Sequence, residues 1–348
     1  MNEIFLIIIV VCVFVLPFFV RKIEENLEIF LFVCGVLAAT AASLWSKELI
    51  ISALEAPVHI CIVLFFVSII FKQFHGSICA LADFAGEKCG IAVTLALIVI
   101  VLGFLSSVIT AIVAALILSE IASILCITRR DRIKLIVYSC FAIGAGAVLL
   151  PVGEPLSTIT ISKLAEPPHN ADAFFLLKLL WPYTVSIILI MAFLAYKIAD
   201  KPTEGPTCEL VRGIHSFKEI ITRTLRVYVF ILALVFLGEA LQPLASRFIV
   251  FLSAPVIYWV NLVAAVLDNA TVAAIVVVPE MSRQSLTYLL VSLIVGGGML
   301  VPGNIPNIIS ASKLRIKSKE WAKIAIPLGM ILFVLYFVAL TVCYGFFN

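Results

Sequence analysis

The stretch that decides the fold is residues 295–314, which read VGGGMLVPGNIPNIISASKL. It interrupts a long apolar run with Gly, Pro and Asn, and such residues break a helix and leave backbone groups without partners. In water this would be a surface loop. Inside a membrane, broken backbone is tolerated only where it is buried in protein or lines a wet cavity. The stretch therefore predicts a broken membrane helix beside a binding cavity.

The composition indicates an all-α integral membrane protein. Of the 348 residues, 63% are hydrophobic and only 13% are charged, against about a quarter charged in soluble domains. Mean hydropathy is +1.21. The nine cysteines form no CxxC pair and no Cys/His cluster, so we expect no cofactor or resident metal. No charge run points to nucleic acid. The N-terminal apolar run has no small-residue cleavage site and is interpreted as a retained helix.

About 20 apolar residues cross a bilayer as a helix. Ordinary spans are predicted near 3–20, 27–45, 50–71, 173–196, 226–242 and 325–347. Four further apolar stretches contain polar or helix-breaking residues. These are 90–127 at Ser106 and Ser107, 136–164 at PVGEP, 248–282 at Asp268 and Asn269, and 286–312 at PGNIP.

The basic residues predict the topology, because cytoplasmic loops retain Lys and Arg. We take 90–127 and 248–282 as re-entrant hairpins, and 136–164 and 286–312 as broken helices that cross the membrane. Segments 21–26, 72–88, 128–134, 197–226 and 313–323 then lie inside, with 2, 2, 4, 6 and 5 basic residues, together 19 of the chain's 24. Eight spans and two hairpins result. We expect a multi-pass protein of a prokaryotic plasma membrane, with both termini on the outer side.

This arrangement predicts an inverted repeat, a recurring design of secondary transporters. Residues 1–49 precede it. Residues 50–196 read helix, hairpin, broken helix, helix, and 226–348 repeat the series from the opposite side, after a cytoplasmic linker at 197–225. At a constant offset of 150, residues 146–164 and 296–314 share seven identities: Gly146/Gly296, Leu150/Leu300, Gly153/Gly303, Ile159/Ile309, Ser162/Ser312, Lys163/Lys313 and Leu164/Leu314.

The two hairpin tips and the two broken helices are expected to form one ion-binding site. Its candidates are Ser106, Ser107, Thr110, Gly153, Glu154, Ser157 and Thr158 from the first repeat, and Asp268, Asn269, Thr271, Gly303, Asn304 and Asn307 from the second. Glu154 and Asp268 are central, since a carboxylate at membrane depth is costly and suggests function. Such a group can hold a proton or a metal cation, and can exchange one for the other.

Structural roles remain open for the same residues. Asp268 has the sequence position of a helix N-cap, Glu154 has that of a solvated residue at the mouth of a shallow break, and serines and threonines commonly bond to carbonyls of their own helix. His59 and Glu239 are interpreted as structural. Glu120 and Glu280 are expected to form ion pairs near Arg129 and Arg283.

The sequences LDNATVAAI at 267–275 and VPGNIPNIISASKL at 301–314 resemble segments of the ion transporter superfamily. That group includes D-type sodium/proton antiporters, arsenite permeases and citrate or divalent-anion symporters. The nearest resemblance is to prokaryotic membrane proteins of unknown function that carry the label of cation transporter. The resemblance covers about 57–347. It implies a homodimer. It also implies a sodium site at Asp268, Asn269 and Asn304, to which Thr271, Gly303 and Asn307 also belong. The related half of the site would be formed by Ser106, Ser107, Gly153 and Glu154.

The tips also depart from that superfamily. The divalent-anion symporters carry Ser-Asn-Thr at both tips, whereas this chain has Ser-Ser-Val and Asp-Asn-Ala, which argues against dicarboxylate binding. We therefore expect a sodium(cation)/proton antiporter that works by alternating access. The alternative is a sodium-coupled or proton-coupled transporter of a small anion, held at helix N-termini. The chain has no GxxxxGK[ST] motif and no paired metal-ligand motif, so we do not expect an enzyme.

Overall fold

The computed structural model describes residues 2–20, 22–23, 26–55, 57–58, 61–62, 65–66, 90–125, 127–198, 217–249, 252–262 and 269–346. Within these ranges every regular element is a helix. The continuous helices are α1 (Asn2–Phe19), α3 (Leu27–Ala41), α5 (Ile91–Ile109), α6 (Ala111–Ile124), α9 (Phe175–Tyr196), α10 (Phe217–Ile249), α11 (Ala254–Val260), α12 (Asn269–Val276) and α15 (Ser318–Phe346). Two further helices are broken: α7 (Arg129–Ala147) with α8 (Pro155–Lys163), and α13 (Arg283–Gly297) with the 3₁₀ turn η2 (Val301–Gly303) and α14 (Ile305–Lys313). Residues 47–55 are also helical.

Four described helices are long and apolar enough to cross a membrane. They comprise Ile91–Ile109, Phe175–Tyr196, Thr224–Leu241 and Ser318–Gly345. The all-helical class is as predicted, and these helices are those of a membrane-embedded protein. The expected spans at 3–20 and 27–45 are helical as α1 and α3, but neither is among these four long apolar helices. Of the expected span at 50–71, the described residues 50–55, 57–58, 61–62 and 65–66 are helical, and the rest, including His59, lies outside the described residues.

The long arms of the two broken helices form the centre of the molecule. Nearly every residue from Ile133 to Ala147 in α7 is buried, and so is every residue from Leu286 to Gly297 in α13. A helix that is buried on all faces must be small or apolar all round. Glycine permits the closest approach: a Cβ at Gly146 of α7 would lie 1.7 Å from the carbonyl oxygen of Gly103 in α5.

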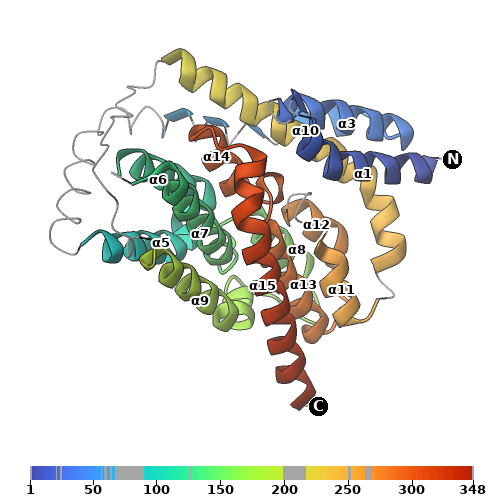
Figure 1. The fold of residues 1–348 in the computed structure, drawn as a ribbon. Coiled ribbons are helices and arrows are strands. Elements are labelled where there is room, and N and C mark those ends of the chain that lie inside the picture. Colours follow the sequence, from blue (N-terminus) through green and yellow to red (C-terminus); the bar gives the residue numbers. More distant parts are fainter. Residues whose placement is uncertain are drawn as a thin grey trace.

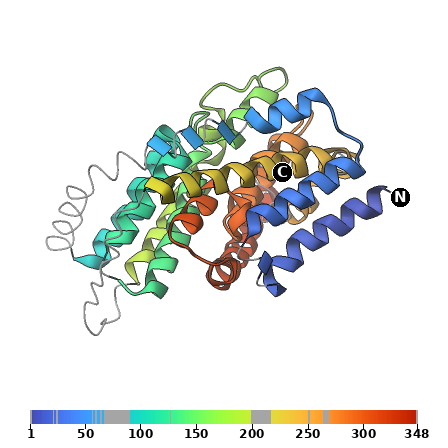
Figure 2. The same ribbon diagram turned by 90° about the horizontal axis from the view of Figure 1, so that it is seen from above.

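Four shorter helices, α6, α8, α12 and α14, pack crosswise between the two halves of the chain. α6 of the first half packs against α14 of the second, and α12 of the second half packs against α8 of the first. α1, α3 and α10 lie together along one side of this assembly (Figures 1 and 2). These four shorter helices therefore lie beside the breaks that follow α7 and α13.

Several element boundaries differ from those expected. α10 begins at Phe217, so the end of the predicted 197–225 linker is helical. α7 begins at Arg129, seven residues before the predicted 136–164 element, because Thr128 caps its first turn through the backbone N–H of Asp131. The interruption in 90–127 lies at Thr110 and not at Ser106 and Ser107, because Thr110 adopts φ 76° and ψ 148°, a conformation that ends a right-handed helix.

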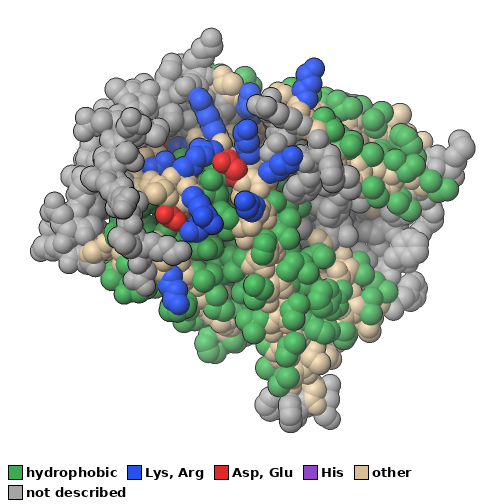
Figure 3. All heavy atoms as spheres, viewed as in Figure 1, with side chains coloured by type: hydrophobic (Ala, Val, Ile, Leu, Met, Phe, Trp, Pro, Cys, Tyr) green, Lys and Arg blue, Asp and Glu red, His purple; other side chains and the backbone are tan. Residues whose placement is uncertain are grey.

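Basic side chains gather on one face of the molecule (Figure 3). Arg129 of α7 pairs with Glu320 of α15 at 3.0 Å and also donates to the carbonyl oxygen of Arg315. Arg226 of α10 pairs with Glu28 of α3 at 3.5 Å. Arg226 also lines one hollow with Arg315 and Lys317. Segments 128–134 and 313–323 and this part of α10 thus lie near one another, as expected of basic segments on one side of a membrane.

Candidate functional site

The break between α13 and α14 is held open by an asparagine amide. Asn304 is extended (φ −155°, ψ 147°) and ends the helical path, while Pro306 occupies the first turn of α14, where no N–H is needed. Asn307 Nδ2 donates to the carbonyl oxygens of Gly297 at 2.8 Å and Leu300 at 2.9 Å. One side chain thus satisfies two carbonyls that the break removed from the helical ladder.

The break between α7 and α8 has the same backbone path. Glu154 is extended (φ −158°, ψ 163°), as Asn304 is 150 positions later, and Pro155 begins α8. Ser157 Oγ donates to the carbonyl oxygen of Leu150 at 2.9 Å, which matches the bond from Asn307 to Leu300 at the same offset. The two breaks therefore use corresponding residues to accept and donate corresponding bonds.

The turn between α5 and α6 meets the first break directly. Thr110 caps α6, its hydroxyl accepting from the Val113 N–H at 3.3 Å. The next backbone N–H, that of Ala111, donates to the carbonyl oxygen of Gly153 at 2.8 Å. A Cβ at Gly153 would lie 2.0 Å from the Ala147 carbonyl oxygen, so only glycine fits this path. The structure thus brings Gly153 to the turn at Thr110, and both are predicted site residues.

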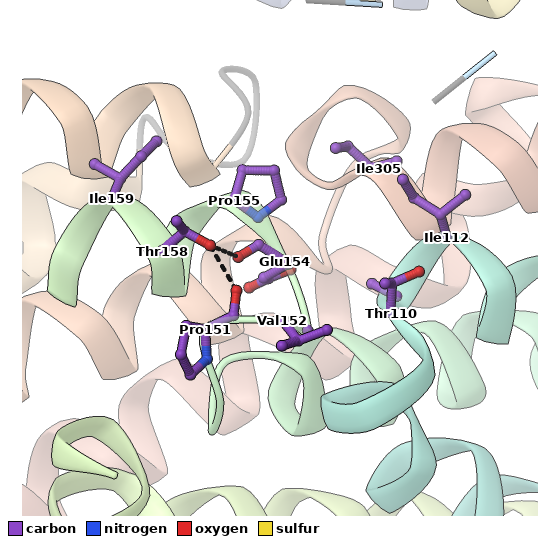
Figure 4. A pocket seen from close by; sticks show the side chains of 11 residues that line it. Thr110, Ile112, Pro151, Val152, Glu154, Pro155, Thr158, Ile159 and Ile305 are labelled. Carbon is purple, nitrogen blue, oxygen red and sulfur yellow. Dashed lines mark hydrogen bonds between the residues drawn. The ribbon is translucent and has the colours of Figure 1, made fainter. Parts of the chain in front are cut away.

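A cavity of about 370 Å³ lies at this contact. Thr110 and Ile112 line it from the start of α6, Glu154 and Thr158 from the first break, and Ile305 from the second break (Figure 4). The Thr158 hydroxyl donates to the Pro151 carbonyl oxygen at 2.5 Å. Residues of both halves of the chain therefore share one cavity, and Glu154 brings a carboxyl group to it.

Glu154 is buried, with 7% of its surface exposed. The interpretation of this residue as a solvated group at a shallow mouth is therefore wrong. The chain places its backbone where α8 begins, next to the Pro155 ring, so its carboxyl group lies at the N-terminal end of a helix. A negative charge is stabilised there by the helix dipole.

Buried amide atoms without hydrogen-bond partners lie beside the second break. Asn269, the first residue of α12, is 2% exposed, and neither its Nδ2 nor its Oδ1 has a hydrogen-bond partner. Asn307 is fully buried, and its Oδ1 is also unpartnered. Both side chains lie at Gly297, where a Cβ would come within 2.3 Å of Asn269 Nδ2. Unpaired buried polar atoms are rare in proteins and commonly indicate an ion or water site.

Other predicted residues have structural roles or lie elsewhere. Ser106 Oγ donates to the carbonyl oxygens of Gly103 at 2.7 Å and Ile143 at 3.0 Å, and Ser107 Oγ to that of Phe104 at 2.7 Å. Their hydroxyl donors are therefore used in holding α5 together and fixing it to α7, and neither serine lines the cavity. Gly303 is buried in η2, and the Asn304 amide lies beside Gly144 of α7.

Two predicted ligands cannot be placed. Asp268 and the side chain of Thr271 lie outside the described residues, although α12 begins at Asn269, directly after Asp268. In the part of the chain that the structure describes, no group of three or more His, Cys, Asp and Glu side chains could hold a metal ion. Oxygen donors from Glu154, asparagine amides and backbone carbonyls remain, and these suit a hard cation.

One polar cluster was missed by sequence reasoning. Lys313 of α14 donates to Glu120 of α6, and beside them Ser119 Oγ donates to Ser310 Oγ at 3.2 Å. The expected partner of Glu120, Arg129, instead pairs with Glu320. The sequence signal was the repeat identity of Lys163 and Lys313. Lys163 also donates across the two halves of the chain, to the Val277 carbonyl oxygen after α12 at 3.2 Å.

The chain belongs to the family described as protein of unknown function (DUF1646), whose model matches residues 3–343. No curated protein matches it.

Proposed function

We propose that this member of the DUF1646 family is a secondary active transporter that exchanges a small cation, sodium in the first place, for protons. The observation that carries the proposal is a pair of buried amide side chains beside Gly297, those of Asn269 and Asn307. The oxygen atoms of both amides have no hydrogen-bond partner. A hard cation would satisfy both oxygens. As the transported substrate, it would occupy the site only during part of the cycle.

The proton would be carried by a carboxylate. Asp268 directly precedes Asn269 in the chain, and we assign it the shared role of proton and cation ligand. Glu154 is the second acid, buried at the cavity that both halves line. Because a buried carboxylate is stable either protonated or beside a cation, one site can hold the two species alternately but not together.

The architecture we propose is an inverted repeat with two re-entrant hairpins, as in the ion transporter superfamily. It is supported by the matched breaks, in which Glu154 and Asn304 share one backbone conformation, and by the crosswise packing of α6 on α14 and α12 on α8. Two structurally equivalent breaks that meet near the centre of the molecule are typical of transporters with alternating access. Homodimer formation and a place in the plasma membrane of a prokaryote, with both termini outside, belong to this proposal.

The test is proton flux in proteoliposomes that enclose a pH dye. Gradients of sodium, lithium, potassium or calcium are imposed on the wild type, Asp268→Asn and Glu154→Gln. Glu280→Gln serves as the matched control, because Glu280 is an exposed carboxylate in the turn after α12. We expect a cation-dependent flux that Asp268→Asn abolishes, that Glu154→Gln reduces by tenfold or more, and that Glu280→Gln leaves unchanged.

The results also separate the alternative. No flux with any cation, from protein that remains folded, would overturn the exchange proposal. Uptake of a labelled carboxylate or oxyanion that requires sodium would then favour the anion transporter, in which the N-terminal ends of α8 and α14 hold the anion.

A further inference from the structure

A second hollow lies on the basic face, away from the two breaks. It has a volume of about 460 Å³ and is lined from α7 by Arg129, Arg130 and Lys134 and from α15 by Lys323, with one carboxylate, Glu320, among them. Its remaining lining residues, such as Ile133 and Ile324, are largely apolar. The hollow therefore combines several cationic groups with an apolar wall.

Two of the four cations are already neutralised. Arg129 forms a two-bond ion pair with Glu320 through Nε and Nη2, at 3.2 and 3.0 Å. Lys134 pairs with Asp131 at 2.8 Å. Burial by itself would raise the pKa of Asp131, but hydrogen bonds from Lys134 and Thr128 hold that pKa below its ordinary value, so the carboxylate is charged at neutral pH.

Arg130 and Lys323 are left to attract an anion. Both side chains are exposed, and neither forms an ion pair with the described residues. They lie on different helices at the rim of one hollow. An arginine and a lysine that approach from two sides can bind a phosphate group together, the arginine through its planar fork and the lysine as a point charge.

The apolar wall continues along α15. Ile324 lines the hollow, and Ile331, Leu335 and Val338 follow at spacings that place them on the same side of the helix. Ile331 is 67% exposed, and Leu335 and Val338 are about half exposed. In a candidate membrane span these side chains face lipid. Ile324, Ile331, Leu335 and Val338 thus form an apolar stripe that runs along α15 from the cationic rim, as an acyl chain runs from its headgroup.

We propose that this hollow between α7 and α15 binds the phosphate headgroup of an anionic phospholipid, with Arg130 and Lys323 as its ligands and the exposed stripe of α15 beside its acyl chains. The site is separate from the cavity at Glu154, so it stands or falls independently of the transport proposal. Juxtamembrane basic groups on one face are the expected receptors of anionic lipid. A free phosphate would use the same cations but would gain nothing from the stripe.

The experiment counts lipids retained by the intact, detergent-solubilised protein in native mass spectrometry, during titration with phosphatidylglycerol or phosphatidylcholine. The test variant is Arg130→Gln/Lys323→Gln. Its control is Arg283→Gln/Lys178→Gln, which removes one exposed arginine and one exposed lysine from outside the basic face. We expect wild type and control to prefer phosphatidylglycerol, and the test variant to lose about 25-fold in apparent affinity for it, at roughly fivefold per cation.

Three results would overturn the proposal. These are equal retention of the two lipids by the wild type, unchanged retention of phosphatidylglycerol by the test variant, and displacement of the lipid by inorganic phosphate at a matching concentration, which would assign the hollow to free phosphate. Thermal unfolding of both variants, compared with wild type, shows that lost binding is not lost folding.

Discussion

Lys313, at the end of α14, donates a hydrogen bond to Glu120 of α6, and the two side chains are only 1% and 10% exposed. The pair joins residues 193 positions apart and links the two halves of the chain at the packed contact of α6 with α14. Ser310, on the same helix as Lys313, accepts from Ser119 Oγ at 3.2 Å and from Cys140 Sγ at 3.6 Å. A buried charge without its partner is strongly unfavourable, so each member of the pair depends on the other.

Removing one member of this pair should therefore cost more than removing both. We expect Lys313→Met or Glu120→Leu alone to lower the free energy of unfolding by about 3–5 kcal/mol, and the double replacement to lose clearly less than either. Thermal unfolding of the four proteins in detergent measures this. A double variant that loses the sum of the two single effects would show that the side chains are not coupled.

Gly297→Ala should stop cation exchange and leave the protein folded. The added Cβ would lie 2.3–2.6 Å from the amide of Asn269, and because that amide is the end of a side chain, it would turn away at modest cost. Gly296→Ala is the matched control, since its Cβ would meet only ordinary contacts at 3.6 and 3.9 Å. Proteoliposome flux and the melting temperature are measured for both. Equal flux from the two variants would separate Asn269 from the site.

Asn307→Ala should destabilise the second break more than Ser157→Ala destabilises the first. The asparagine satisfies two carbonyls across the break, those of Gly297 and Leu300, whereas the serine spans its break only to Leu150 and otherwise bonds to Glu154 within its own turn. Leaving buried carbonyls unsatisfied costs about 1–3 kcal/mol each. We expect a loss of about 2–4 kcal/mol for Asn307→Ala and about 1 kcal/mol for Ser157→Ala, measured by unfolding in detergent. Equal losses would contradict this account of the break.

The topology predicts that a cysteine at Asn348 can be labelled from outside the cell. Asn348 follows the predicted span 325–347, and Lys323 is exposed near the start of α15. In a cysteine-free background, a membrane-impermeant maleimide should label Asn348→Cys in intact cells, and should label Lys323→Cys only after permeabilisation. The reverse pattern would place the basic face outside and invert the predicted orientation.

The sequence was most informative where it departed from plain hydrophobicity. The Gly, Pro and Asn residues of 295–314 predicted a break, and the structure ends α13 at Gly297 and restarts the helix at Ile305. The repeat offset of 150, found from seven identities, also relates Ser157 to Asn307, which differ in type but donate to corresponding carbonyls. Local chemistry of this kind depends on near neighbours in the chain, so spacing alone reveals it.

Sequence reasoning was least informative about which polar groups meet. A serine hydroxyl can bind a cation, and the sequence predicted this role for Ser106 and Ser107. The structure directs both hydroxyls to helix carbonyls and places the interruption at Thr110. A serine can bond to its own helix or to a ligand at similar energy. Which bond forms depends on the neighbouring helix, here on the close contact of Gly103 with Gly146.

By itself, then, the sequence determined the helical membrane class, the breaks of the two broken helices before Pro155 and Ile305 and the segments that carry basic charge, because each follows from the polarity and backbone freedom of residues close together in the chain. Only the tertiary structure decided that Glu120 pairs with Lys313, that Asn269 and Asn307 meet at Gly297, and that Glu154 shares a cavity with Ile305. Those contacts depend on how helices distant in sequence cross, and helix crossing is set by the packing of whole side-chain surfaces.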